Sequence, residues 1–302
     1  MSYLLQSAIL SPTIDPTIFA QLFVLGVLLG GIYGFAALGL SIIFGVMEVI
    51  NVAHGAFMVI GMYTVWTVSH IFGFSPFFGV PLAAVVLFIL GIALQRTLVA
   101  RVMEESEGDK FLVTVAFLII LIGVIEMQFS STPRELQMEL GSVAIGGVYF
   151  LEGQLYALSI AIITFISVWT FLHYTDIGRA IRGTADNRSS AIYAGINVRR
   201  IDYVTFGLGA GLAGLAGALI TFIQPFDPYL GNQYLTTAFV VVVIGGLGSI
   251  PGTLIGGLII GMIHVFGLFY LPGSYYHVLI MLIFITVLLV KPTGILGSEQ
   301  HE

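Results

Sequence analysis

The sequence predicts an all-α, polytopic integral membrane protein: a helix bundle of about 8–10 transmembrane segments, with room for broken or re-entrant helices. Three observations predict it. Hydrophobic residues make up 58% of the 302 residues and charged residues 9%, whereas about 25% charged is usual in soluble domains. Apolar runs long enough to cross a bilayer core of about 30 Å recur along the chain. Nine of the ten Lys and Arg residues fall in polar stretches that an alternating path places on one side of a membrane.

The first apolar run covers 17–46. It is too long for one straight span and short for two, and glycines interrupt it, so either a tilted or a broken helix would satisfy it. Further runs follow at 56–72, 77–94, 111–129, 155–174, 203–223, 235–250, 253–271 and 275–290. No polar stretch is long enough for a separate soluble domain. We therefore expect an N-terminal segment (1–16), one transmembrane domain (17–292) with a cytoplasmic loop at about 175–202, and a cytoplasmic tail (293–302).

The basic residues predict the orientation. They lie in two loops and after the last run, as Arg96, Arg101 and Lys110, then Arg179, Arg182, Arg188, Arg199 and Arg200, then Lys291. Only Arg134 lies elsewhere, between 130 and 153. The positive-inside rule puts both basic loops and the C-terminus in the cytoplasm and Arg134 outside. The number of apolar runs between these loops agrees, and it places the N-terminus outside if the first run spans once.

Several classes of site are absent from the sequence. Without cysteine there is no disulfide framework, thiolate metal site or Cys nucleophile. No P-loop motif and no HExxH occurs, and the histidines lack ligand spacing. The run Gly246-Leu-Gly-Ser249 places Ser beside Gly, as in intramembrane serine proteases, but no His partner can be argued. We therefore expect no enzymatic activity, no metal, no cofactor in this chain and no nucleic-acid partner.

The longest basic loop carries the string Gly178-Arg-Ala-Ile-Arg-Gly-Thr-Ala-Asp-Asn-Arg-Ser-Ser-Ala-Ile-Tyr-Ala-Gly195-Ile-Asn-Val-Arg-Arg200. A narrow apolar stripe recurs in it at helical spacing, at Ile181, Ala185, Ser189 and Ile192. Arg182 and Asp186 fall four apart on another face, and Gly195 and Asn197 are typical of a helix end. Such a helix can dock into a partner's groove or lie on anionic headgroups. The spacing alone favours neither.

Glu48, Asn51 and His54 form a polar cluster between two apolar runs. They lie three apart and would share one helical face. Ionisable residues at membrane depth indicate a pathway or a partner, whereas an interfacial loop would leave the same residues free to meet water. Both interpretations stay open.

Two patterns of glycine stand out. Pairs at small-xxx-small spacing predict close helix packing: Gly26/Gly30, Gly30/Gly34, Gly207/Gly211, Gly252/Gly256 and Gly257/Gly261. Residues 243–257 hold six Gly and one Pro. Irregular backbone at membrane depth persists only inside protein or beside a cavity. We therefore expect a broken helix or re-entrant turn beside a solute path there. Its candidate residues are Gly245, Gly246, Gly248 and Pro251.

Four strings together resemble permeases of branched-chain amino acid ABC importers, in that family's order. The first is Ala37-Leu-Gly-Leu-Ser-Ile-Ile-Phe-Gly-Val-Met-Glu-Val-Ile-Asn-Val-Ala-His-Gly55, and the second is the basic loop quoted above. The third is Ala238-Phe-Val-Val-Val-Val-Ile-Gly-Gly-Leu-Gly-Ser-Ile-Pro-Gly-Thr-Leu-Ile-Gly-Gly257, and the fourth is Lys291-Pro-Thr-Gly-Ile-Leu-Gly297. They run over nearly the whole chain.

The resemblance implies a permease subunit that forms the path for Leu, Ile and Val in a prokaryotic plasma membrane. Urea or short amides are the alternative cargo within the family. Its implied partners are a second permease, an extracytoplasmic solute-binding protein and two cytoplasmic ATPases that bind ATP and Mg. The ATPases would dock on the basic loop, through Arg179, Arg182, Asp186, Ser189, Ala191, Ile192, Gly195 and Asn197.

One departure concerns the docking loop. ABC importers generally carry Glu-Ala-Ala-x-x-x-Gly there, and the matching register is Ser189-Ser190-Ala191-Ile192-Tyr193-Ala194-Gly195. The Glu is absent, so a salt bridge from that position is not expected. The competing class is a self-contained secondary transporter or channel. It would need intramembrane carboxylates, and only Glu126 and Glu48 are candidates.

Overall fold

A computed structural model describes residues 16–297 except positions 104, 137, 139, 140, 146, 274 and 292. The expected N-terminal segment, apart from Pro16, therefore lies outside the described residues, as does the end of the tail. The described elements are α2 (Pro16–Met47), α3 (His54–His70), α4 (Pro76–Thr97), the 3₁₀ turn η1 (Val99–Arg101), α5 (Glu107–Phe129), β1 (Ser142–Ile145), β2 (Val148–Leu151), α6 (Glu152–Tyr174), α7 (Asp176–Asp186), α8 (Arg188–Tyr193), α9 (Val198–Ile220), α10 (Leu230–Gly245), α11 (Ile250–Tyr270) and α12 (Tyr275–Val290).

The all-α membrane bundle is confirmed. Six of the described helices are long and apolar enough to cross a membrane, and α10 and α12 are shorter apolar helices. The 17-residue α3 accounts for the run predicted at 56–72. The run at 17–46 forms one unbroken 32-residue helix, so the broken-helix alternative is wrong. At about 1.5 Å per residue this helix is about 48 Å long, longer than a bilayer core is thick.

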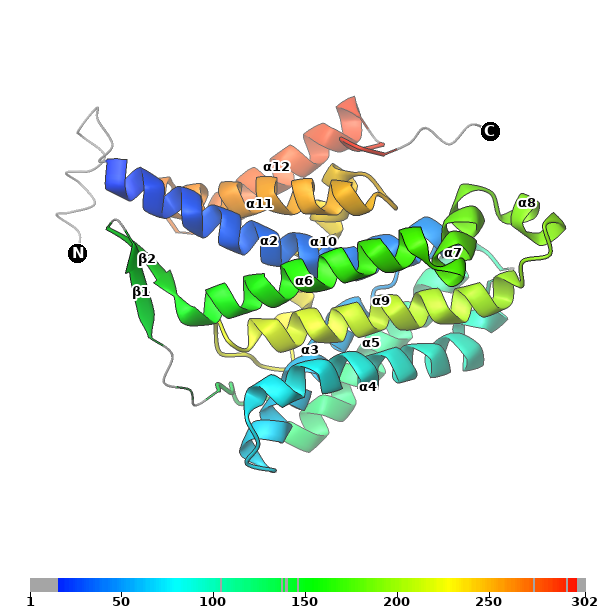
Figure 1. Cartoon of the computed structure of the whole chain (residues 1–302), viewed down its shortest axis with the longest axis horizontal. Helices are drawn as coiled ribbons and strands as arrows, with labels where there is room; N and C mark the ends of the chain where they lie inside the picture. Colours follow the sequence, from blue (N-terminus) through cyan, green and yellow to red (C-terminus); the bar gives the residue numbers. More distant parts are fainter. Residues whose placement is uncertain are drawn as a thin grey trace.

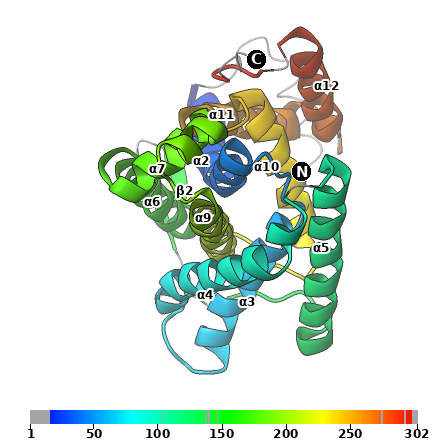
Figure 2. The ribbon, with the colours of Figure 1, turned by 90° about the vertical axis from the view of Figure 1, so that its right-hand side faces the viewer.

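Helices α2, α6, α9 and α11 lie along one common direction (Figure 1), whereas α5 crosses that direction at a steep angle (Figure 2). One end of the bundle carries the β1–β2 hairpin and the start of α2, and the opposite end carries α7 and α8 (Figure 1). The basic loop and the Arg134 loop are thus at opposite ends, as the positive-inside rule requires.

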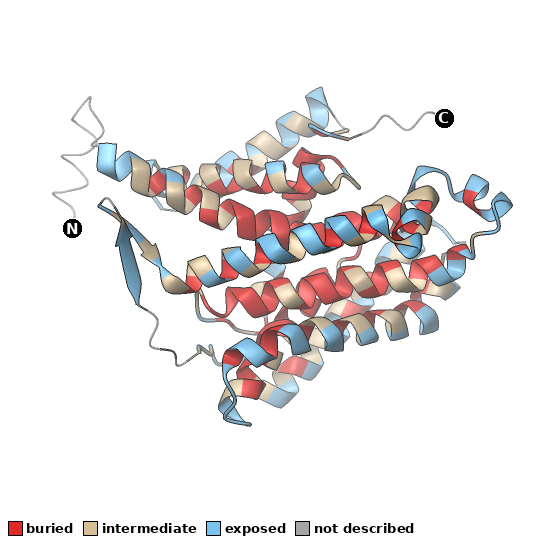
Figure 3. Ribbon diagram, in the orientation of Figure 1, coloured by how far each residue is buried: buried red, intermediate tan, exposed pale blue. Residues whose placement is uncertain are grey.

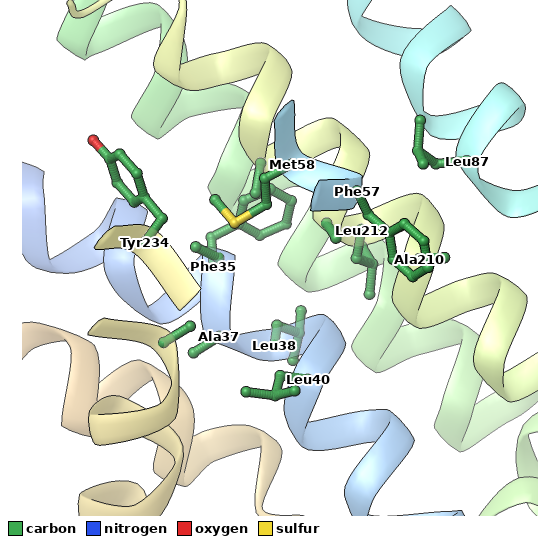
Figure 4. Packing of buried hydrophobic residues seen from close by; sticks show 14 of the residues in the cluster. Phe35, Ala37, Leu38, Leu40, Phe57, Met58, Leu87, Ala210, Leu212 and Tyr234 are labelled. Atoms are coloured by element: carbon green, nitrogen blue, oxygen red, sulfur yellow. The ribbon is translucent and has the colours of Figure 1, made fainter. Parts of the chain in front are cut away.

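Helices α2 and α9 form the centre of the bundle. They are the most completely buried of the long helices, while α4 and α6 alternate between buried and exposed positions (Figure 3). Side chains from α2, α3, α4, α9 and α10 meet in this core; Figure 4 shows Phe35 and Leu38 of α2 near Phe57 and Met58 of α3 and Leu212 of α9. The exposed apolar positions on the outer helices suit contact with lipid.

The close packing predicted for the glycine pairs is confirmed. On α2, a Cβ at Gly30 would lie 2.7 Å from the Leu258 Cα atom, and one at Gly34 would lie 2.9 Å from the Thr253 carbonyl oxygen. Gly257 and Gly261 of α11 present the matching side to Gly34 and Gly30. The pair on α9 meets α4, and the pair at the start of α11 meets α10. Small residues therefore let these backbones touch.

A two-stranded sheet was not anticipated. β1 and β2 pair antiparallel, with Ser142 opposite Leu151. The side-chain amide of Gln21 donates to the Tyr149 carbonyl oxygen (2.8 Å) and its oxygen accepts from the Tyr149 backbone N–H (2.7 Å), so the hairpin docks on the first turns of α2. Arg134 and Phe226 form a further antiparallel bridge at this end.

Candidate functional site

Side-chain caps define a projecting segment of residues 175–197, called the arm below (Figure 1). Thr175 accepts a hydrogen bond from the Gly178 backbone N–H and starts α7. Asn187 accepts one from Ser190 and starts α8, and Asn197 accepts one from Arg200 and starts α9. Each cap satisfies a backbone donor that would otherwise lack a partner at a helix start. The side chains that start each of these helices thus all belong to the arm itself.

The apolar stripe predicted along this segment is wrong. Asn187 adopts an extended conformation (φ −159°, ψ 108°) and divides the arm into two helices, so residues on either side of it share no face. Ile181 is buried, but Ala185, Ser189 and Ile192 are exposed. The buried side of α7 consists of Gly178, Ile181 and Thr184, which pack towards α6, α2 and α9.

The outer tip of the arm combines a short helix with a left-handed glycine. Ala191 is buried, whereas Ile192 is 57% exposed and Tyr193 is 91% exposed. Gly195 has φ +82°, and a Cβ added there would meet no atom within 4 Å, as expected for the residue that ends α8. Asn197 does not end that helix but begins the next one, which corrects its predicted position. Two large apolar side chains thus face outward on a polar projection, which is typical of a protein contact.

Two predicted residues of the arm, Arg179 and Asp186, are exposed, and a third, Arg182, is half-buried with a buried Nε atom. Arg179 forms an exposed ion pair with Asp176. Arg182 donates to the His173 carbonyl oxygen at 3.4 Å. Asp186 is exposed at the end of α7. An exposed pair such as Arg179–Asp176 contributes little stability, so the shape of the arm depends on its caps and its buried side.

The strongest charge pair of the arm was missed. Arg188 donates from both guanidinium nitrogens to Asp202 (3.0 and 2.7 Å), and Asp202 is only 3% exposed. These hydrogen bonds raise the pKa of Arg188, with smaller contributions from the charges of Asp202 and Glu48. The pair locks α8 to the first turn of α9. The positions are 14 apart and belong to two helices, so no helical spacing signals them.

The polar cluster at Glu48 is not helical. α2 ends at Met47, Glu48 has φ +55°, and residues 48–53 lead irregularly to α3. Glu48 is exposed, while Asn51 and His54 are fully buried, so the shared helical face is wrong.

Asn51 and His54 lie inside the bundle. The His54 Nε2 atom is 2.9 Å from the Ala36 carbonyl oxygen, and the Thr114 hydroxyl hydrogen-bonds to the Ile50 carbonyl oxygen (3.1 Å) and the Val52 N–H (3.3 Å). Neither polar atom of the Asn51 amide has a hydrogen-bond partner among the described residues.

The glycine-rich segment forms a tight turn between α10 and α11. α10 ends at Gly245, Gly246 and Gly248 have φ +110° and +79°, and Pro251 lies in the first turn of α11. The helix break predicted within residues 243–257 is therefore present, between α10 and α11. The C-terminal segment covers the turn, because the Ile295 and Leu296 N–H groups donate to the Ile244 and Gly245 carbonyl oxygens (2.9 and 3.0 Å).

The end of α2 lies near both the glycine turn and the arm. Gly45 lies against Gly248, whose Cα atom would be 2.8 Å from a Cβ at Gly45. Three residues after Gly45, the negative charge of Glu48 helps to raise the pKa of Arg188 in the arm. The structure thus brings Glu48, the arm and the glycine turn to one end of the bundle, while Asn51 and His54 lie deeper.

Comparison with known proteins supplies the family. The family model described as "Branched-chain amino acid transport system / permease component" matches residues 22–288 of this chain. The high-affinity branched-chain amino acid transport system permease protein LivH of Salmonella typhimurium is 31% identical, over 94% of this chain and 97% of its own length. LivH of Escherichia coli matches equally, and the permease protein BraD of Pseudomonas aeruginosa is 26% identical over 94% of this chain and 97% of its own.

More distant similarity covers part of the chain. The ribose import permease RbsC of Bacillus subtilis is 32% identical over 51% of this chain and 50% of its own length. No solved structure matches. The resemblance found in the four sequence strings is confirmed by the matches over nearly the full length. The chain belongs to the branched-chain amino acid transport system permease family.

Proposed function

We propose that this chain is a transmembrane subunit of an ABC importer and forms part of the path for leucine, isoleucine and valine. One observation carries the proposal: relatives named as branched-chain amino acid permeases match 94% of this chain. The chain contributes no ATPase site of its own and breaks no bonds. It works as a multi-pass protein of a prokaryotic plasma membrane with its C-terminus in the cytoplasm.

Two cytoplasmic ATPases, which bind ATP and Mg, dock on the arm. The exposed Ile192 and Tyr193 side chains support this, since aromatic and aliphatic anchors dominate the energy of protein interfaces. The residues predicted for docking divide accordingly. Ala191 and Gly195 shape the tip, Ile192 contacts the ATPase, and Ser189 lies exposed beside them. Arg179, Arg182, Asp186 and Asn197 flank the contact.

Movement passes from the arm to the bundle. Closure of the ATPase dimer pulls α8, the Arg188–Asp202 pair carries the motion to α9, and α7 carries it to α2 and α6. Gly45 then transmits it to the turn at Gly248. Gly245, Gly246, Gly248 and Pro251 act there as a hinge beside the path, and Glu48 responds to Arg188. The bundle switches from facing one side of the membrane to facing the other.

The opposite end receives cargo from an extracytoplasmic binding protein. The Arg134–Phe226 bridge supports this, because it joins the loop that carries Arg134 to the loop before α10 and so gives that end a connected surface. A second permease, either a copy or a relative, completes the path.

Reconstitution tests the proposal. The chain is placed in liposomes with its partner permease, ATPases and binding protein, and uptake of leucine is measured with and without ATP. We expect uptake that requires ATP and all four components. Leucine transport by the chain alone down a proton gradient would make it a secondary transporter. Uptake of urea or a short amide in place of leucine would change the cargo but keep the ABC mechanism.

A further inference from the structure

One side of α10 carries exposed polar side chains in its first two turns. Asn232, Gln233 and Thr236 are exposed. Thr236 follows Asn232 by four residues and Gln233 by three, so the three side chains lie on one broad side of the helix, called the α10 polar face below. Tyr229, just before the helix, continues it. The remaining sides of α10 pack on α2, α3, α11 and α12.

The α10 polar face lies well inside the height of the bundle. Tyr234, within the same two turns, packs edge-on against Tyr33, with ring centroids 6.1 Å apart. Tyr33 is close to the middle of α2 (Pro16–Met47). Gly231 touches Gly55, whose neighbour His54 is also tied to the middle of α2. The face is therefore at the depth of the hydrocarbon and not at the level of the headgroups.

At this depth the two carboxamides need polar partners. The Thr236 hydroxyl donates to the Asn232 carbonyl oxygen of its own helix (2.9 Å) and needs no other group. The structure gives the Asn232 and Gln233 side-chain amides no hydrogen-bond partner within its described part. An amide facing lipid tails loses its hydrogen bonds to water without replacement. The face must therefore meet water, solute or the polar groups of another subunit.

The α10 polar face is exposed, and contacts on either side of it join this region to α5 and α12. Seen along the bundle, α10 is set back between α5 and α12 (Figure 2). The Tyr229 hydroxyl donates to the Glu126 carboxylate at 2.9 Å and ties the start of α10 to the end of α5. On the other side, Phe239 of α10 meets Phe284 of α12, with ring centroids 6.1 Å apart. Along α10, the polar face is thus followed by the aromatic side chain of Phe239.

We infer that the α10 polar face is the solute-contacting wall of the path, and that Asn232 and Gln233 hydrogen-bond to the ammonium and carboxylate groups of an α-amino acid. This rests on the proposed function. Each amide offers two donors and one acceptor, so it can serve both ends of a zwitterion. Neutral amides bind more weakly than charged partners, as release from a transport path requires. Phe239, one turn further on, supplies apolar surface for the aliphatic side chain, and the second permease closes the path opposite.

The absence of cysteine from the chain makes the wall directly testable. Asn232→Cys and Gln233→Cys are each introduced and assembled into the full transporter in liposomes. A charged, membrane-impermeant methanethiosulfonate is the probe. Ile163→Cys, on an α6 residue that is 64% exposed and sits among apolar residues, is the matched control. We expect labelling at 232 and 233, protection by saturating leucine in the presence of binding protein, and no labelling at 163.

Transport by the same complexes separates the two claims. If the Ile163→Cys complex takes up leucine but 232 and 233 stay unreactive, the α10 wall is wrong and the proposed function stands. If both positions react but no complex takes up leucine, the cargo is wrong and the wall stands as a water-filled surface without its assigned solute.

A second pair of variants tests the hydrogen bonds. Asn232→Leu should lower the leucine uptake rate about tenfold, the factor expected for one lost hydrogen bond. Asn232→Gln keeps the amide and should stay within about threefold of the natural chain. Co-purification of the ATPases with both variants verifies assembly. Wild-type uptake by an assembled Asn232→Leu complex would overturn the assignment.

Discussion

The arm and the glycine turn are both breaks between helices at one end of the bundle, but they are stabilised mainly by different kinds of contact. The arm breaks at Asn187 and is held by side chains: three polar caps and the Arg188–Asp202 pair. The turn breaks at Gly246 and is held mainly by backbone contacts between glycines and the C-terminal segment, with one side-chain cap, in which the Ser249 hydroxyl accepts from the Gly252 N–H (3.2 Å). A projection fixed by side chains can present Tyr193 to a partner, whereas glycines without a Cβ let the backbones of α2, α11 and the C-terminal segment meet at the turn.

The largest effect should come from adding a single methyl group to the turn. A Cβ at Gly245 would overlap the Gly252 carbonyl oxygen, and neither backbone can retreat. Gly245→Ala should therefore destabilise the protein by about 3 kcal/mol or more. Thermal unfolding in detergent measures it. Gly123→Ala in α5, where a Cβ meets no atom within 4 Å, is the control and should be neutral. Equal unfolding temperatures for the two variants would contradict the backbone contact.

The next effect concerns the charge pair of the arm. Arg188→Ala leaves the buried Asp202 carboxylate without its bidentate partner. Because Arg188 is itself 41% exposed, we expect a loss of about 2 kcal/mol, less than for a fully buried pair. Uptake should fall with it, since α8 loses its anchor on α9. The comparison variant is Arg179→Ala, whose pair with Asp176 is exposed, and whose stability should change by less than about 0.5 kcal/mol. The account fails if the two variants behave alike.

The tip should affect docking more than folding. Gly195→Val forces a β-branched residue to φ +82°, a strain of about 1–2 kcal/mol that distorts the end of α8. Ala191→Asp places a carboxylate on the buried side of the same helix. We expect both chains to insert and to bind less ATPase, measured by co-purification from membranes. Tyr149→Ala, on the hairpin at the opposite end, should bind ATPase normally. Normal uptake by both tip variants would argue against docking there.

The smallest effect is the loss of one cap. Asn187→Ala removes the acceptor for the Ser190 N–H at the start of α8 and should cost about 1 kcal/mol. Hydrogen exchange of residues 188–193 measures it and should rise locally. Asn187→Asp retains an acceptor and should exchange like the natural chain. Uniformly faster exchange over α9 as well would mean that the cap stabilises more than the arm.

Hydropathy and residue spacing predicted most of the membrane bundle. Each apolar run forms a helix, and the glycine pairs lie at close helix contacts. Both could be predicted because the length of an apolar run and the small size of glycine can be read directly from the sequence. The division of the arm into two helices was not predicted. The side chain of Asn187 caps α8 and so competes with continuation of α7, and the position of α8 depends on the pairing of Arg188 with Asp202 of α9. The position of Gly195 was predicted because a left-handed residue favours glycine locally.

The polar residues were harder to place. Glu48, Asn51 and His54 share a helical spacing, yet the chain leaves the helix at Glu48 and buries only the other two. The α10 polar face was not found, although Asn232, Gln233 and Thr236 stand together at the edge of an apolar run. The sequence shows that they are polar, but their depth follows from the Tyr33–Tyr234 contact between α2 and α10, which no local pattern encodes.

Site-specific cross-linking tests the central claim, that the tip of the arm is the surface on which an ATPase docks. Tyr193→Cys provides a unique thiol in the otherwise cysteine-free chain, and a short thiol-directed photo-cross-linker is attached to it in the assembled transporter. The account predicts a covalent product with the ATPase from position 193 and none from Tyr149→Cys on the hairpin. ATPase cross-linked from 149, or an assembled and active complex without product at 193, would contradict it.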